Sequence, residues 1–217
     1  MIFLRNNLFS LIALLGMVVA SLLFHSSMPE SVPVHFNWQG NPDGFAPRTV
    51  AAVMLPAAFL VIIVMMQFLF RISPRQFSMP SSARAVDITV FSIGVLFLFL
   101  HYALLTTYED QGGFQRLFGY GMAGFLVICG NVLGKTEPNF FIGIRIPWTI
   151  ASMANWKATH RLAGLLMVLA GVVLLITNSV APSQKITVSL TVAAVVVPVF
   201  YSIYFYFTRE RDQEGAD

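Results

Sequence analysis

Histidine and acidic side chains gather on one predicted side of the protein, where they could bind a metal ion or respond to pH. The set comprises His25, His35, His101, Glu30, Asp43, Glu109 and Asp110. Imidazole and carboxylate groups are common metal ligands, and histidine changes its charge near neutral pH. Because the spacings match no metal-binding motif, interfacial histidines with ordinary hydrogen-bond partners are favoured. We expect no cofactor, and a metal or pH-sensing site stays open as the alternative.

The connection at residues 25–49 has the pattern of a small folded unit. Apolar residues alternate with others from Val32 to Phe36, as in a short strand, and the glycines and proline of residues 40–44 predict a turn. Aromatic and polar side chains of such a unit could recognise a ligand. The residues expected to do so are His35, Asn37, Trp38 and Asp43. Composition does not separate this role from anchoring at the membrane surface by Trp38 and Phe45.

A second long connection, residues 134–161, is too apolar for a free cytosolic segment and is expected to lie on the membrane interface. Thr149 or Ser152 can cap a short helix that continues into the next apolar run. Arg145 lies among apolar neighbours and needs a phosphate headgroup, a carboxylate or a helix C-terminus as its partner. The residues that we single out here are Asn139, Gly143, Arg145, Pro147, Trp148, Thr149, Trp156 and His160.

Apolar runs long enough to cross a bilayer must position these two connections. The chain of 217 residues is 57% hydrophobic and 11% charged, whereas a soluble domain is about 45–50% apolar and about 25% charged. This composition excludes a soluble enzyme and a disordered regulator, and the single cysteine, Cys129, excludes an internal disulfide. Six runs are predicted as membrane-spanning helices. They are Leu8–Phe24, Val50–Phe70, Ala85–Thr106, Leu117–Leu133, Leu162–Asn178 and Val188–Phe207. The expected fold is an all-α polytopic membrane protein.

The distribution of lysine and arginine predicts the orientation of the helices, because basic residues favour cytoplasmic loops. With both termini in the cytoplasm, ten basic residues lie inside: Arg5, Arg71, Arg75, Arg84, Lys135, Arg145, Lys157, Arg161, Arg209 and Arg211. Three lie outside: Arg48, Arg116 and Lys185. We therefore predict cytoplasmic termini. The basic residues form no cluster, so no direct binding to nucleic acid is expected.

The predicted spans carry few ionisable groups near the middle of the bilayer, which argues against a pump or an active transporter. Glycines crowd the fourth span, at positions 119, 121, 124, 130 and 134. Close helix packing explains them, and Gly130 with Gly134 could also form a dimer face. A cavity bordered by these glycines would instead suit a transporter of a small amphipathic compound. A membrane-bound hydrolase is disfavoured, since no nucleophile is paired with a base, and we expect no enzymatic activity.

Both long connections resemble known sequence patterns. The series Asn139, Gly143, Arg145, Pro147, Trp148 and Thr149, followed by Trp156, Thr159, His160, Arg161 and Gly164, resembles the signature of the SdpI family. Pro29, Pro33, His35 and Phe36, with Gly40 and Asp43, resemble the uncharacterised domain that often precedes it. We expect a two-helix unit at residues 1–70, a connecting third helix at 71–116, and an SdpI-like three-helix unit at 117–217.

The resemblance implies a function that composition alone does not give. SdpI-like proteins are bacterial inner-membrane immunity proteins that protect a cell from a secreted, membrane-active toxin peptide. In the founding system the protein also holds a transcriptional repressor of the ArsR type at the membrane. The implied partners are the lipid bilayer, a toxin peptide on the outer face and a repressor on the inner face, and a homo-oligomer stays open. The alternative function is a small-molecule or peptide transporter.

Overall fold

The computed structural model describes residues 7–72, 80–139 and 141–210. Seven α-helices are described: α2 (Leu8–Phe24), α3 (Arg48–Ile72), α4 (Pro80–Thr106), α5 (Gln111–Leu133), α6 (Pro147–Ala151), α7 (Met153–Val180) and α8 (Gln184–Phe205). A short 3₁₀ turn, η1 (His25–Ser27), follows α2, and a π-helical turn, η3 (Tyr206–Glu210), follows α8. Strands β1 (Ser31–Phe36) and β2 (Pro42–Pro47) form an antiparallel hairpin between α2 and α3.

The six predicted spans are confirmed as helices. Within the described residues, six helices are long and apolar enough to cross a membrane. Several extend beyond the predicted runs because their polar ends are helical as well; α7, for example, starts at Met153 instead of Leu162. Their outward faces carry exposed apolar side chains such as Leu22, Val61 and Phe200, as expected where lipid covers a helix. Arg5, Arg75 and Arg211, which entered the orientation argument, lie outside the described residues, as does Phe140.

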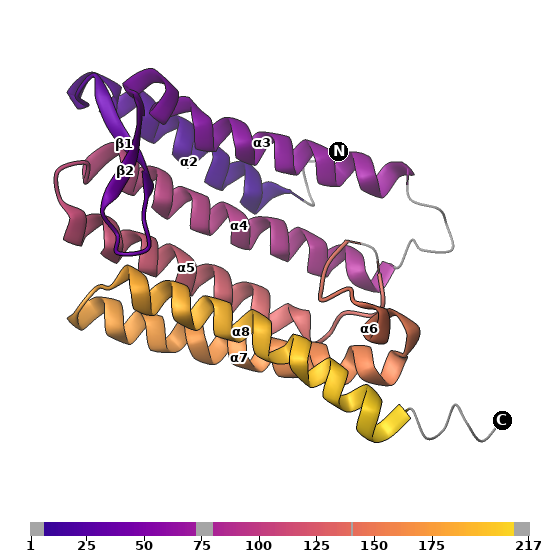
Figure 1. Ribbon diagram of the computed structural model, residues 1–217. Coiled ribbons are helices and arrows are strands. Elements are labelled where there is room, and N and C mark those ends of the chain that lie inside the picture. Colours follow the sequence, from indigo (N-terminus) through magenta and orange to yellow (C-terminus); the bar gives the residue numbers. More distant parts are fainter. Residues whose placement is uncertain (1–6, 73–79, 140, 211–217) are drawn as a thin grey trace.

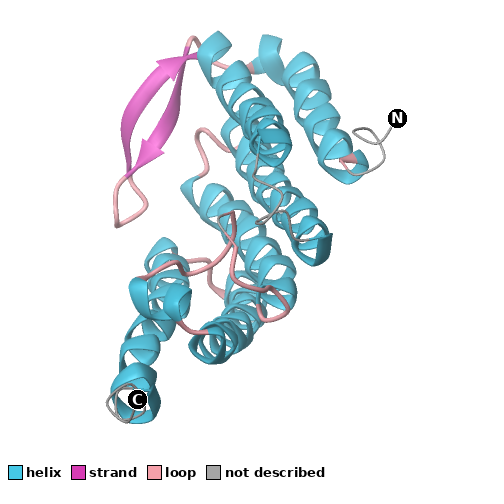
Figure 2. Cartoon of the chain, turned by 90° about the vertical axis from the view of Figure 1, so that its right-hand side faces the viewer, coloured by secondary structure: helices cyan, strands magenta, loops and turns pink. Residues whose placement is uncertain are grey.

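The helices lie side by side along one direction, and the two long connections fold at opposite ends of the bundle (Figure 1). In order across the bundle, α2 and α3 pack on α4, α4 packs on α5, α5 packs on α7, and α7 packs on α8 (Figure 2). The hairpin covers the end where α2 finishes and α5 begins. The segment that contains α6 covers the end where α5 finishes and α7 begins.

Glycines bring α5 and α7 into backbone contact. A Cβ atom added at Gly164 would lie 2.6 Å from the carbonyl oxygen of Gly130, and one added at Gly171 would lie 2.9 Å from that of Ala123. One added at Gly134 would lie 3.3 Å from the Cα of Arg161. Small residues permit this close approach, which stabilises helix pairs in lipid. Gly130 and Gly134 therefore face a helix of the same chain, so the idea that they form a dimer face was wrong.

Buried polar groups join helices that are distant in sequence. His101 of α4 is fully buried, and its Nε2 lies 2.8 Å from Ser21 Oγ and 3.2 Å from the carbonyl oxygen of Met17, both on α2. Ser21 also donates to the carbonyl of Ala52 on α3 at 2.7 Å. These contacts tie three helices together below the hairpin. His101 is therefore part of the helix packing and not part of an interfacial histidine cluster.

Candidate functional site

The hairpin is a folded cap on the end of the bundle. The predicted strand is confirmed as β1, whose Val32 is fully buried together with Ala51 of α3 and Leu105 of α4. Phe36 stacks on Phe114 of α5, with ring centroids 3.7 Å apart and an interplanar angle of 18°. The apolar residues of β1 thus lie against three different helices, which fixes the hairpin on the bundle.

The turn of the hairpin lies earlier in the chain than predicted. The backbone N–H of Gly40 donates to the carbonyl of Asn37, and Pro42 already belongs to β2, where it pairs with Phe36. Asn37 sets this turn, because its side-chain oxygen accepts from the backbone N–H groups of Gln39 and Asn41, at 3.0 Å each. Gly40 has a φ of +86°, a conformation that glycine adopts readily.

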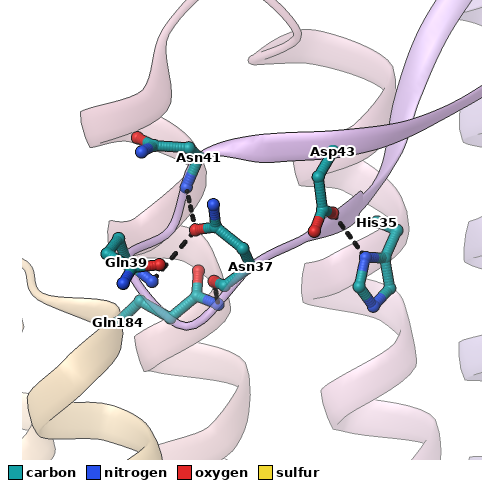
Figure 3. A network of polar contacts seen from close by, with 6 residues as sticks. All are labelled: His35, Asn37, Gln39, Asn41, Asp43 and Gln184. Atoms are coloured by element: carbon teal, nitrogen blue, oxygen red, sulfur yellow. Dashed lines mark hydrogen bonds and ion pairs between the residues drawn. The ribbon is translucent and has the colours of Figure 1, made fainter.

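Glutamine side chains from two helices hold the tip of the hairpin, and Figure 3 shows one of them, Gln184. Gln184, the first residue of α8, donates from Nε2 to the carbonyl oxygen of Asn37 at 2.8 Å. Gln111, the first residue of α5, donates to the carbonyl oxygen of Gly40 and to Asn41 Oδ1, at 2.7 Å each. The tip therefore bridges the helices of the N-terminal half, where the hairpin begins, and those of the C-terminal half.

The four residues predicted to recognise a ligand all lie on this hairpin but have different environments. His35 and Asp43 are exposed neighbours on adjacent strands, and His35 Nδ1 pairs with the Asp43 carboxylate (Figure 3). Trp38 is half exposed at the tip. Asn37 is partly buried and shapes the turn, so three of the four remain accessible to a partner. His25 bonds to Thr49, and the described residues hold no group of three metal-ligating side chains.

A cavity of about 180 Å³ lies beneath the hairpin. Its walls come from β1, from the ends of α3, α4 and α5, and from Gln184 of α8. Most of the lining is apolar, including Phe36, Leu104, Phe114 and Phe118. His35 and Gln184 are the polar residues of the lining. This cavity could not be predicted from the sequence, because its walls come from five separate elements.

At the other end of the bundle, Asn139 and His160 fold the connection between α5 and α7. Asn139 Oδ1 accepts from the backbone N–H groups of Phe141 and Ile142, at 2.8 Å each. His160 Nε2 accepts from the N–H of Ile144 at 2.9 Å, while Nδ1 lies 2.8 Å from the carbonyl oxygen of Trp156. A backbone N–H only donates and a carbonyl only accepts, so His160 is the neutral tautomer with its proton on Nδ1.

Trp156 and Gly143 complete the core of this connection. The Trp156 ring is fully buried, stacks on the His160 ring with centroids 4.0 Å apart, and donates from Nε1 to the carbonyl oxygen of Thr136 at 2.9 Å. Gly143 has a φ of +113°, and a Cβ atom there would lie 2.3 Å from His160 Nε2. Only glycine fits between this backbone turn and the imidazole. These residues fold the connection and are not free to contact a partner.

Of the two predicted caps, Ser152 caps the helix that holds Trp156 and His160, whereas Thr149 lies within the preceding α6. Thr149 is fully buried in α6, and its hydroxyl accepts from the N–H of Ile146 at 3.1 Å and lies 2.7 Å from the carbonyl oxygen of Ile144. Ser152 is the N-cap of α7 and accepts from the N–H of Asn155 at 3.2 Å. Pro147, the first residue of α6, is exposed and has no N–H to satisfy.

Arg145 and Pro147 are the exposed members of the motif. Trp148 is partly buried, with its ring centroid 6.5 Å from that of Tyr206. Thr149, Trp156 and His160 are fully buried, and Asn139 is 8% exposed. The motif therefore divides into a structural core and a smaller accessible part.

A polar network that sequence reasoning missed links this connection to the end of α8. Asn155 Nδ2 donates to the carbonyl oxygen of Ser202 at 3.0 Å, and Ser202 Oγ donates back to Asn155 Oδ1 at 2.7 Å. Thr159 donates to the same amide oxygen at 3.0 Å. The Glu210 carboxylate accepts from the hydroxyl of Ser152. Polar residues within apolar runs, such as Asn155 and Ser202, are the signal that could have suggested such a network.

The glycines of α5 are not among the residues that line the cavity beneath the hairpin. Cβ atoms added at Gly121 and Gly124 would meet Phe99 and Val95 of α4, and one added at Gly119 would lie 2.1 Å from Asn178 Oδ1 of α7. Neighbouring helices occupy the space beside these residues. The observation that motivated the transporter alternative is therefore explained by helix packing.

Six apolar helices with a folded connection at each end define a polytopic helical membrane protein. Residues 135–205 match the SdpI/YfhL protein family, and residues 12–60 match a domain of unknown function, DUF1648. The chain is 23% identical over 208 residues to Immunity protein SdpI of Bacillus subtilis (strain 168), covering 93% of this chain and 96% of that protein. No solved structure matches. The predicted resemblance to the SdpI family, and to the domain that precedes it, is confirmed.

Proposed function

We propose that this protein is a non-catalytic receptor of the immunity type in the bacterial cytoplasmic membrane, which protects the cell against a secreted, membrane-active toxin peptide. The similarity to Immunity protein SdpI, which extends over 93% of the chain, carries this proposal. Both termini lie in the cytoplasm in this arrangement, in keeping with the ten-to-three distribution of basic residues. The hairpin then faces the outside and the connection with α6 faces the cytoplasm.

The hairpin is the part of the molecule suited to contact the toxin. It presents Trp38, which is 50% exposed, and Phe45, which is 61% exposed, beside the paired His35 and Asp43. Aromatic side chains supply large contact areas at low entropic cost, and a carboxylate beside them favours a cationic or hydrogen-bonding partner. The anchored tip holds these groups in place before a ligand arrives.

The cytoplasmic connection is the proposed contact for a repressor of the ArsR type. Arg145 and Pro147 are exposed there, and Ile150 and Met153 are each about half exposed. A surface that combines a guanidinium group with apolar side chains is typical of protein contacts. The buried motif residues, such as His160, hold the backbone of this connection in place beneath the exposed side chains.

Survival of toxin-sensitive bacteria tests the proposal. Cells would carry the wild type, Trp38→Ala, Asp43→Asn, or an empty vector, and would grow beside a strain that secretes a membrane-active toxin peptide. We expect survival with the wild type and loss of protection with both hairpin variants at equal membrane levels. Lys185→Gln, an exposed change at the same end of the bundle, is the matched control. Equal killing of wild-type and empty-vector cells would refute the immunity function.

The cytoplasmic contact has a separate readout. Crosslinking from the inner face, followed by a pull-down, should recover a DNA-binding repressor with the wild type and with Lys157→Gln, which changes an exposed residue of α7. Arg145→Ala should recover less than a tenth as much. Recovery that is equal for Arg145→Ala and the wild type would show that the repressor, if bound, uses another surface.

A further inference from the structure

Three exposed cations lie at the end of the bundle where α5 finishes and α7 begins (Figure 1): Lys135, Lys157 and Arg161. A Cβ atom added at Gly134 would lie 3.3 Å from the Cα of Arg161 and 3.7 Å from its Cγ, so the residue before Lys135 lies against Arg161. Lys157 precedes Arg161 by one turn of α7, and residues four apart on a helix have Cβ atoms about 5–6 Å apart. The three long side chains can therefore reach one bound group.

No carboxylate of the described residues neutralises these cations. Their side chains make no hydrogen bond or ion pair within the described part of the chain. Like charges four residues apart on a helix repel each other, which destabilises the helix. An anion bound between Lys135, Lys157 and Arg161 would remove this repulsion, so the three residues form a candidate anion site.

The depth of the three cations in the membrane matches that of a phospholipid phosphate. Helix α7 has 28 residues and is therefore about 42 Å long, whereas the hydrocarbon core of a bilayer is about 30 Å thick. About twenty residues cross that core, and twenty residues counted back from Val180 end at Arg161. Arg161 thus lies at the edge of the core, and Lys157 lies one turn beyond it, among the headgroups.

The exposed face of α7 that carries Arg161 continues into the membrane as an apolar row. Leu165, Leu169 and Val172 follow Arg161 at a spacing that keeps them on one side of the helix, and each is about half exposed. A lipid can place an acyl chain along this row while its phosphate contacts the cations. A free phosphate would leave the row uncovered, and a water-soluble protein does not reach residues at this depth. The joined charged and apolar surfaces therefore favour a lipid.

We infer that Lys135, Lys157 and Arg161 bind the phosphate of one anionic phospholipid, whose acyl chain lies along the row that begins at Leu165. The planar guanidinium of Arg161 donates two parallel hydrogen bonds to phosphate oxygens, and the two lysines add charge. Basic sites between membrane helices bind lipid headgroups in this way. Phosphatidylethanolamine carries its own ammonium group, which the cations repel, so the site selects an anionic lipid such as phosphatidylglycerol.

Native mass spectrometry of the full-length protein in detergent, titrated with phosphatidylglycerol or phosphatidylethanolamine of the same acyl chains, tests the inference. We expect phosphatidylglycerol to bind at least tenfold more tightly. The double variant Lys135→Gln and Arg161→Gln should weaken its binding roughly 25-fold, since each cation near an anionic headgroup contributes about fivefold. Equal binding of the two lipids by the wild type would overturn the inference.

The matched control for the double variant is Arg116→Gln with Lys185→Gln. It removes the same two charges from exposed positions at the hairpin end of the bundle. Binding of phosphatidylglycerol should stay within about twofold of the wild type in this control. An equal loss in both double variants would show that only the overall charge matters and would overturn the site. Lys135→Glu, which leaves Arg161 in place, should weaken binding at least tenfold and replaces the double variant if that variant fails to fold.

Two further arms separate a lipid from a free anion. Millimolar inorganic phosphate should not displace bound phosphatidylglycerol, and displacement would overturn the assignment to a lipid. Leu165→Ser should weaken lipid binding about threefold or more, because it removes apolar contact with the acyl chain. Val192→Ser, at an exposed position of α8, is its control, and equal binding by the two variants would overturn the placement of the chain. None of these measurements requires a toxin, so failure of the lipid site would leave the proposed immunity function in place.

Discussion

Replacing Gly143 by alanine should open the connection between α5 and α7. The backbone at Gly143 has a φ of +113°, and the added Cβ would lie 2.3 Å from His160 Nε2 and 3.3 Å from the Trp156 ring. A residue other than glycine in such a conformation costs about 1–3 kcal/mol. The displaced imidazole also loses the N–H of Ile144, which it accepts at 2.9 Å, at a cost of about 1 kcal/mol. The local free energy of opening should fall by about 2–4 kcal/mol.

Hydrogen exchange measured by mass spectrometry reports this change directly. A loss of about 2–4 kcal/mol corresponds to roughly 30- to 1,000-fold faster exchange of the Ile144 amide, since each 1.36 kcal/mol is a factor of about ten. Gly112→Ala is the matched control, because its Cβ would meet nothing closer than Asp110 Oδ1 at 3.5 Å. His160→Phe keeps a ring on Trp156 but removes the acceptor, and it should accelerate the same amide. Wild-type exchange rates in both Gly143→Ala and His160→Phe would refute the reasoning.

Two further predictions concern the packing of α7. Gly164→Leu should lower the stability of the purified protein by about 1–3 kcal/mol or more, because its side chain would meet the carbonyl of Gly130 at 2.6 Å or less. Leu165→Ile, an exposed change one position on, should leave the melting temperature within about 2 °C of the wild type. Equal melting temperatures of the two variants would contradict the contact. Asn155→Leu should lower the stability by about 1–3 kcal/mol and speed amide exchange at the end of α8, because it removes both hydrogen bonds to Ser202. Lys157→Leu, an exposed change nearby, should leave that exchange unchanged. Wild-type protection of the α8 end in Asn155→Leu would show that the network contributes nothing.

The spans could be predicted because their signal is local. A run of apolar residues such as Leu8–Phe24 satisfies the length requirement of a bilayer by itself, and the structure gives α2 the same bounds. The strand from Val32 to Phe36 is likewise visible in a few neighbouring residues. The turn after it was placed too late because both glycines of residues 40–44 suit a turn, whereas the chain reverses around the side chain of Asn37.

The interactions between helices could not be predicted from one sequence. Ser21 and His101 are 80 residues apart, and Asn155 and Ser202 are 47 apart, so no local pattern pairs them. The predicted topology correctly placed His101 near the end of its helix that lies beside the hairpin. The face of the helix on which His101 lies, however, depends on how α2 packs against it. The motif of residues 139–160 was recognised as a unit, yet only the structure separates buried members such as His160 from the exposed Arg145.

Helix α8 runs between the two folded ends and is hydrogen-bonded at both. Its first residue, Gln184, holds the hairpin tip through Asn37, and Ser202 near its other end bonds to Asn155 at the start of α7. Tyr206, just beyond α8, lies beside Trp148. A displacement of the hairpin tip would therefore act through Gln184 on a helix whose far end is bonded into the segment that contains α6 and the start of α7. Coupling between the two ends requires that α8 can take two arrangements, and that these arrangements differ in the contacts of α8 at both of its ends. The hydrogen bonds of Gln184 and Ser202 are the contacts that must differ between the two arrangements.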